Sequence, residues 1–117
     1  MKITRAIKTK EFANVLKNGE KKRGAILTLY SLKDLSCAEK LSVGVIVSKR
    51  VSASAVRRNY IRRLIYAYFR EHKGQATRGT LIAIRVVSDI NKKSRKALSL
   101  EVRDELKDLT TKAAIII

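Results

Sequence analysis

This 117-residue chain has no proline or tryptophan and only one cysteine and one histidine. Cys37 therefore cannot form an internal disulfide, and a reduced, intracellular setting is the simplest interpretation. The lone cysteine and histidine also cannot supply the ligands of a structural zinc site. No segment approaches the roughly 20 apolar residues of a membrane span, and the N-terminus lacks the apolar stretch of a secretory signal. We therefore expect a cytoplasmic protein without a membrane partner.

Acidic residues are scarce as well. Ten Asp and Glu stand against 27 Lys and Arg, which gives a formal net charge of +17. This charge is concentrated, because residues 40–70 contain eight basic residues and no acidic one. Such a segment favours a polyphosphate partner, since each phosphate that it neutralises releases condensed counterions. The alternative is a solvated basic face that binds nothing.

Low-complexity tracts, internal repeats and proline-rich linkers are absent, so we interpret residues 1–117 as one domain. The C-terminal tail of about 110–117 is expected to fray. Helical spacing between Thr9, a candidate cap, and Gly19 predicts a helix over residues 9–18. An amphipathic pattern predicts a last helix over 98–109, with Ser99 as a candidate cap.

Between these helices, short apolar segments rich in β-branched residues predict strands. The predicted strands cover residues 25–32, 41–48 and 80–87. A loop of hairpin type is expected between the first two, and residues 19–26 leave room for a further short strand. This order favours a small sandwich of helices on a mixed sheet.

The basic segment has a helical period over residues 56–70. One side of the projected helix is mostly apolar and contains Val56, Tyr60, Ile61, Leu64, Ile65, Ala67 and Tyr68, with Arg57 among them. The opposite arc of about 140° contains Arg58, Asn59, Arg62, Arg63, Tyr66 and Arg70. Arginines gathered on one face repel one another unless an external anion binds there, and the planar guanidinium suits phosphate.

Three anionic partners fit a basic helix: DNA, RNA and a membrane surface. The apolar side is needed to cover the predicted strands, which argues against membrane insertion. Helix-turn-helix spacing and zinc ligands are missing, which argues against DNA. RNA is favoured by default. On the basic arc, Asn59 offers the donor and acceptor that a base edge or a 2′-hydroxyl requires, and Tyr66 offers a ring on which a base can stack. A tyrosine half-buried at the helix rim is the alternative for Tyr66.

The segment VGVIVSKRVSASAVRRNYIRR (Val43–Arg63) resembles the signature of the bacterial ribonuclease P protein subunit. The segments IKTKEFANVLKNG, ILTLYSL and TLIAIRVV are similar to the family's opening helix and two of its strands. The resemblance implies an α+β fold, an αβββαβα two-layer sandwich like the second domain of a small-subunit ribosomal protein. It also implies a mixed four-stranded sheet with a left-handed βαβ crossover, against the usual right-handed rule.

For function, the resemblance implies the protein subunit of a ribonucleoprotein endoribonuclease. An RNA subunit would remove the 5′ leader of precursor tRNA with magnesium, which the RNA mainly holds, while the protein binds the RNA subunit and the leader. No obligate protein partner is evident. The chain agrees with this division, because its carboxylates, Cys37 and His72 form no catalytic or metal-binding pattern. We therefore assign no catalytic and no metal-binding residue.

The resemblance also assigns binding residues. Those for the RNA subunit are Ser48, Lys49, Arg50, Arg58, Asn59, Arg62 and Arg63. We add Arg57, Tyr66 and Arg70 of the same helix to this set. Those for a leader-binding cleft are Phe12, Leu16, Thr28 and Tyr30. Phe12 in the core and Tyr30 on the sheet surface are the structural alternatives. The chain departs from the family pattern at Tyr60 and Tyr66, where basic residues are expected, and at Leu16, where an aromatic is expected.

Two other functions are compatible with the same charge. A ribosome-associated or general RNA-binding protein would take no part in tRNA processing and would not prefer precursor over mature tRNA. A protein-only nuclease would cut precursor tRNA without an RNA subunit. Affinity that depends on the leader when the RNA subunit is present distinguishes a ribonuclease P subunit from the general RNA-binding protein. Cleavage without an RNA subunit would identify the nuclease.

Overall fold

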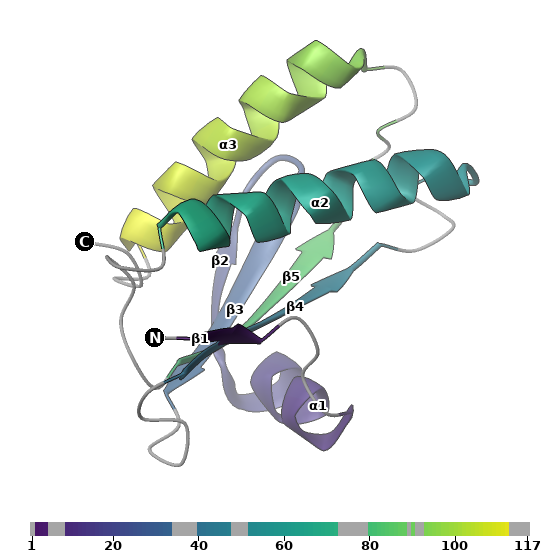
Figure 1. Ribbon diagram of the computed structural model, residues 1–117. Helices are drawn as coiled ribbons and strands as arrows, with labels where there is room; N and C mark the ends of the chain where they lie inside the picture. Colours follow the sequence, from purple (N-terminus) through teal and green to yellow (C-terminus); the bar gives the residue numbers. More distant parts are fainter. Residues whose placement is uncertain are drawn as a thin grey trace.

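The computed structural model describes residues 2–4, 9–33, 40–47, 52–72, 80–88, 90 and 93–112. These residues form one sheet and three helices (Figure 1). The elements are β1 (Lys2–Thr4), α1 (Thr9–Asn18), β2 (Glu20–Arg23), β3 (Leu27–Lys33), β4 (Lys40–Ile46), α2 (Ala55–Glu71), β5 (Thr80–Val86) and α3 (Arg95–Lys112). From α1 onward this is the predicted αβββαβα order, including the further short strand, β2.

The sheet is mixed, as predicted, and its strand order is β1-β4-β5-β3-β2. The strands β1, β4 and β5 run parallel, while β3 is antiparallel to β5 and β2 is antiparallel to β3. The strand β1 adds a fifth strand to the four expected. It pairs with β4 over only three residues, Lys2–Thr4, and so short a segment has no strand period in the sequence.

The predicted hairpin between β3 and β4 is wrong, because β5 lies between them. Four successive residues of β5, from Leu81 to Ile84, are at most 1% exposed. A strand that is apolar on both faces belongs in the middle of a sheet that is covered on both sides. In the sheet, β4 is therefore separated from β3 by one strand position, and β5, which comes later in the chain, occupies that position.

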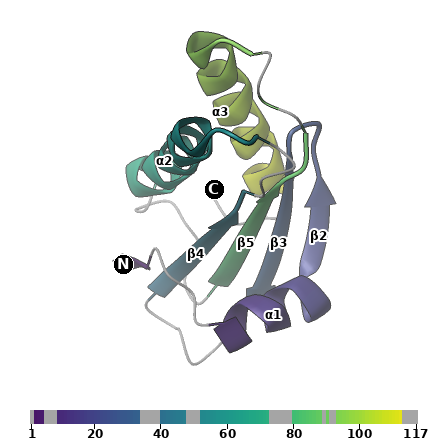
Figure 2. The same ribbon diagram turned by 90° about the vertical axis from the view of Figure 1, so that its right-hand side faces the viewer.

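The connection from β4 through α2 to β5 is a left-handed crossover, as the family resemblance implied. In Figure 1, β4 runs from left to right, α2 returns from right to left above the sheet, and β5 lies behind β4. Figure 2 shows the same order from the side, with β4, β5, β3 and β2 in sequence across the sheet. Because β4 and β5 are parallel neighbours, this path has the rarer hand.

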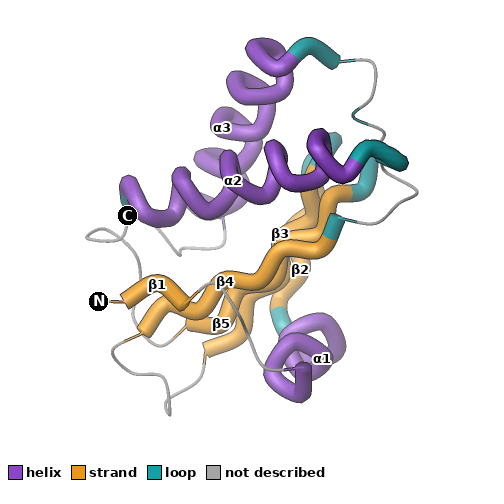
Figure 3. Tube along the Cα trace, turned by 45° about the vertical axis from the view of Figure 1, so that its right-hand side comes forward, coloured by secondary structure: helices purple, strands orange, loops and turns teal. Residues whose placement is uncertain are grey.

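The helices cover both faces of the sheet. The helices α2 and α3 lie on one face and α1 lies on the other (Figure 3). The main core lies under α2 and α3 and is built around Phe69, Ile65, Leu98 and Leu106. A smaller cluster joins Val15 of α1 to Tyr30, Leu81 and Ala83. The two-layer description thus fits α2, α3 and the sheet, and α1 adds a partial third layer.

Serine side chains cap the two long helices. The hydroxyl of Ser54 accepts a hydrogen bond from the backbone N–H of Arg57 at 3.3 Å, at the start of α2. At the start of α3, the hydroxyl of Ser94 accepts one from Ala97 at 3.1 Å. The expected cap at Ser99 is therefore wrong, and α3 begins three residues earlier than its apolar pattern.

The helix α3 also extends into the tail that was expected to fray. Its last residue is Lys112, and Thr110 is fully buried. The Thr110 hydroxyl donates to the carbonyl oxygen of Leu106 at 2.7 Å and lies 3.4 Å from the Tyr68 hydroxyl. The fraying prediction is therefore wrong for 110–112, and 113–117 lie outside the described residues.

Candidate nucleic-acid interface

The apolar side of α2 packs into the main core. Ile61, Ile65 and Phe69 are fully buried, and Tyr68 is 5% exposed. Val56, predicted to lie on this side, is 62% exposed. The buried side of α2 therefore includes Phe69 and excludes Val56, unlike the projected apolar side. This side of the helix packs against the protein core. In the described ranges, no helix is long and apolar enough to cross a membrane.

The opposite side of α2 carries a group of polar and basic side chains. A shallow hollow of about 300 Å³ is lined by Asn59, Arg62, Arg63, Tyr66 and Arg70, which we call the α2 basic face. All five were predicted to bind the RNA subunit, and the structure brings them together. The Arg62 guanidinium donates to the Asn59 side-chain oxygen at 3.0 Å, so these two residues hold one another in place.

Among the described residues, no carboxylate neutralises the charge of this face. Within the part of the chain that the structure describes, no carboxylate forms an ion pair with Arg58, Arg62, Arg63 or Arg70. The ion pairs lie elsewhere and join Lys22 to Glu20, Lys93 to Glu101, Arg103 to Glu71 and Lys112 to Asp108. An anion that binds the α2 basic face therefore meets guanidinium groups without first displacing an internal carboxylate.

Tyr66 belongs to this face and also to the core. It lines the hollow, is half-buried, and packs against the main core. This placement agrees with the alternative of a tyrosine at the helix rim. The part of the Tyr66 side chain that lines the hollow is accessible to a base.

Arg57 does not belong to the α2 basic face. Its guanidinium donates to the carbonyl oxygens of Ile90 at 3.0 Å and Lys93 at 2.8 Å, in the connection between β5 and α3. These hydrogen bonds give Arg57 a structural role on the inward side of α2, and its assignment to RNA binding stays a prediction. Arg58 donates to the carbonyl oxygens of Ser52 at 3.0 Å and Ala53 at 3.3 Å, just before α2.

We expect Arg57→Ala to lower the free energy of unfolding by about 1.5–3 kcal/mol, because two part-buried carbonyl groups lose a charged donor. Urea unfolding followed by circular dichroism measures this change. The matched control is Arg63→Ala, which removes an exposed arginine of the same helix and should change stability by less than about 0.5 kcal/mol. Equal destabilisation by both changes would contradict an internal role for Arg57.

The predicted strand-end residues Ser48, Lys49 and Arg50 lie outside the described residues. Their assignment to RNA binding stays a prediction. They directly follow Val47, which is 6% exposed, and precede Ser52, which is 1% exposed. The chain is thus anchored in the core on both sides of this segment.

The predicted leader cleft is largely filled. Tyr30 is 7% exposed and Thr28 is 4% exposed, while Leu16 is half-buried against the cluster between α1 and the sheet. Phe12 lies in α1, but its side chain is outside the described residues. Tyr30, expected to form a stacking platform with Phe12, is thus covered by the cluster between α1 and the sheet. The assignment of these residues to the leader stays a prediction.

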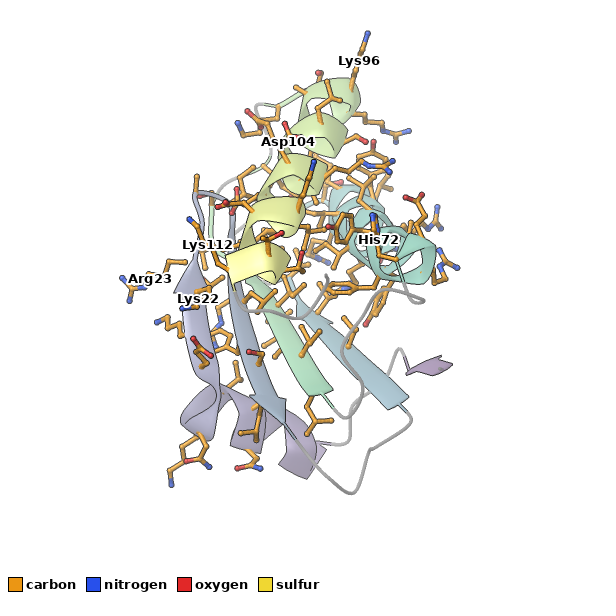
Figure 4. The ribbon with its side chains drawn as sticks, turned by 90° about the vertical axis from the view of Figure 1, so that its left-hand side faces the viewer. Lys22, Arg23, His72, Lys96, Asp104 and Lys112 are labelled. Carbon is orange, nitrogen blue, oxygen red and sulfur yellow. The ribbon has the colours of Figure 1, made fainter. Side chains whose placement is uncertain are left out.

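Basic residues that the sequence reasoning missed lie on the same sheet face. Arg23 pairs with Thr28, and Thr28 pairs with Arg85, so these three side chains share one row across the sheet. Arg23 and Arg85 are exposed, and Arg23 extends outward from β2 in Figure 4. The Lys21 ammonium lies 5.6 Å from the centre of the Tyr30 ring. The sequence did contain a signal for this basic row, because Arg85 is a charged residue inside an otherwise apolar predicted strand.

The described residues offer no site for a metal ion. No three His, Cys, Asp or Glu side chains among them come close enough to hold one. The donors of the α2 basic face are guanidinium groups and one amide, which do not fit magnesium, an ion that prefers carboxylate and phosphate oxygens.

Comparison with known proteins gives one consistent family. A family model described as Ribonuclease P matches residues 2–114. A "Ribonuclease P protein component" from Pseudanabaena sp. is 34% identical over 106 residues, covering 91% of this chain and 87% of that protein. One from Clostridium acetobutylicum is 29% identical over 117 residues, covering 100% and 94%.

Solved structures give the same fold. The Staphylococcus aureus RNase P protein superimposes with a TM-score of 0.84 at 22% identity, covering 99% of this chain and 100% of that one. The Thermotoga maritima RNase P protein gives 0.78 at 20% identity, covering 92% and 96%. These two solved structures therefore share the fold of this chain over nearly its whole length.

Proposed function

Because this chain belongs to the bacterial ribonuclease P protein family, the protein component of a tRNA-processing endoribonuclease, we propose that it binds two RNAs. One is the catalytic RNA subunit, and the other is the 5′ leader of precursor tRNA. In this proposal the RNA subunit carries out the hydrolysis that releases the leader. The protein positions the two RNAs and contributes no catalytic residue.

The observation that carries this proposal is the α2 basic face. Arg62, Arg63 and Arg70 line one hollow together with Asn59, and no described carboxylate pairs with these arginines. Guanidinium groups bind phosphate oxygens in pairs, and release of counterions makes each contact favourable. The Asn59 amide adds a group that can bond a base edge or a 2′-hydroxyl. We assign this face to the RNA subunit.

Magnesium belongs to the RNA subunit in this proposal. Folded RNA brings phosphates close together, and their repulsion must be screened by cations. The arginines of α2 supply part of that positive charge at the contact surface. The protein should therefore lower the magnesium concentration that cleavage requires, without binding the ion itself.

We assign the leader to the sheet face that carries α1. Tyr30 and Thr28 are buried there, but Arg23 and Arg85 are exposed in one row and Lys21 lies beside the Tyr30 ring. Exposed lysine and arginine side chains such as these bind the phosphates of an RNA strand, and phosphate contacts do not read its base sequence. Leader binding in this chain should therefore depend strongly on salt and only weakly on leader sequence.

Leader-dependent affinity tests the proposal. The protein with the RNA subunit should bind precursor tRNA more tightly than mature tRNA, and the Kd for each is measured by filter binding at fixed magnesium and salt. Arg85→Gln should reduce the preference for the precursor, because it removes one phosphate contact, by about threefold. Equal affinity of the complex for both tRNAs would favour the general RNA-binding protein instead.

A further inference from the structure

Tyr60 of α2 and Arg95 of α3 contact one another through two separate interactions. The Tyr60 hydroxyl donates a hydrogen bond to the backbone carbonyl oxygen of Arg95 at 3.0 Å. The Arg95 guanidinium carbon lies 5.4 Å from the centre of the Tyr60 ring, within the range of a cation–π contact. The side chain of Arg95 is thus held against α2, although its backbone belongs to α3.

This contact places Arg95 beside the α2 basic face. Tyr60 and Arg63 are three residues apart on α2 and are therefore neighbours on the helix surface. Arg63 is exposed and Tyr60 is half-buried, so the surface passes from Arg63 over the tyrosine ring to Arg95. The family pattern has a basic residue where this chain has Tyr60, and the structure brings Arg95 to that place from another helix.

The charge of Arg95 is not neutralised within the described residues. Its neighbour Lys93 forms an ion pair with Glu101 at 2.8 Å, but no described carboxylate pairs with Arg95. Arg95 and Lys96 are both exposed, and Lys96 extends away from the molecule in Figure 4. The first turn of α3 has no acidic residue. Cations in a first turn are disfavoured by the helix dipole, so this arrangement does not serve helix stability.

The same surface has clear boundaries. At the other end of α2, Glu71 pairs with Arg103 at 2.7 Å, which neutralises the charge there. Farther along α3, the acidic residues Glu101, Asp104 and Asp108 alternate with exposed basic residues, and Lys93 and Lys112 pair with two of them. The rest of α3 is therefore close to neutral, and the attraction of a polyanion beyond the α2 basic face is confined to the first turn of α3.

We propose that Arg95 is a further contact to the phosphates of the RNA subunit, and that Tyr60 is the residue that positions it. This inference rests on the proposed function, because the RNA subunit is the partner assigned to the α2 basic face. The interface then spans two helices that are separated by β5 in the sequence.

The test measures the Kd for the RNA subunit at several salt concentrations. Arg95→Gln should weaken binding about threefold to tenfold and reduce the slope of log K against log salt by about 1, as for the loss of one phosphate contact. The matched control is Lys107→Gln, which removes the same charge from an exposed position farther along α3, where acidic and basic residues alternate. Lys107→Gln should leave the slope unchanged. Equal slopes for the two variants would overturn the assignment of Arg95.

A double-mutant cycle tests the role of Tyr60. Tyr60→Leu should weaken binding and reduce the slope as much as Arg95→Gln, and the double variant should show no further loss. Urea unfolding of each variant shows whether a loss of binding follows a loss of folded protein, and a purely structural role would not change the salt slope. Additive losses in the cycle would show that Tyr60 does not act through Arg95.

The two proposals fail in different ways. If the unmodified protein does not bind the RNA subunit, the proposed function itself is wrong. If it binds, and Arg62→Glu weakens binding while Arg95→Gln behaves as Lys107→Gln does, the function stands and the extension to α3 is wrong.

Discussion

Replacing Arg62 with glutamate is expected to weaken binding of the RNA subunit by about tenfold to a hundredfold, because a phosphate contact becomes a like-charge repulsion. Arg62 lies at the centre of the effect, since its guanidinium lines the hollow and also holds the Asn59 side chain at 3.0 Å. The same change should raise the magnesium concentration needed for half-maximal cleavage, as more phosphate charge is left to be screened. The measurements are the Kd for the RNA subunit and a magnesium titration of cleavage.

The control for this prediction is Lys107→Glu. It changes the net charge by the same amount at an exposed position on α3, far along the chain from the α2 basic face. Both variants should unfold at nearly the same urea concentration as the unmodified protein. If Arg62→Glu leaves the Kd and the magnesium requirement unchanged, α2 is not part of the contact surface.

The second large effect concerns Glu105, which joins α3 to the start of β3. Its carboxylate accepts hydrogen bonds from the backbone N–H of Leu27 at 2.6 Å and of Ile26 at 2.9 Å and 3.1 Å. Glu105→Ala should lower the free energy of unfolding by about 2–3 kcal/mol, because two part-buried N–H groups lose a charged acceptor. That is a large fraction of the roughly 5–15 kcal/mol that stabilises a typical domain.

Two further variants show whether stability depends on the hydrogen bonds of the Glu105 carboxylate or only on the net charge of α3. Asp104→Ala removes the same charge from the neighbouring exposed position and should change stability by less than about 0.5 kcal/mol. Gly24→Ala acts on the contact from the other side, since a Cβ at Gly24 would collide with the Glu105 carboxylate. Gly24→Ala should therefore also destabilise the protein in urea unfolding. Similar stabilities for Glu105→Ala and Asp104→Ala would refute the link between α3 and β3.

The elements that were predicted well are those with a strong local signal. The bounds of α1, Thr9–Asn18, agree with the prediction from a helical period and the glycine that follows it. The α2 basic face also follows from one period, because Arg62, Arg63 and Arg70 need only the helix itself to come together. Handedness of the crossover came from family resemblance, and general rules predicted the opposite.

The features that were missed depend on contacts between distant segments. The pairing of β1 with β4 and the place of β5 between β3 and β4 are set by the whole sheet. Burial of Tyr30 depends on where α1 lies, which the alternation of β3 alone does not give. Arg57 and Arg95 are both arginines of helix first turns, yet one is bound internally and the other is exposed. Only the packing of α2 against α3 distinguishes them.

The most direct test of the central claim is 5′ cleavage of a precursor tRNA at low magnesium and near-physiological salt. Three reactions are compared, with the cognate RNA subunit alone, with the protein alone, and with both. We predict cleavage only when both are present, as expected for an auxiliary subunit that binds RNA through the α2 basic face. Cleavage by the protein alone, or no gain when the protein is added to the RNA subunit, would contradict this account.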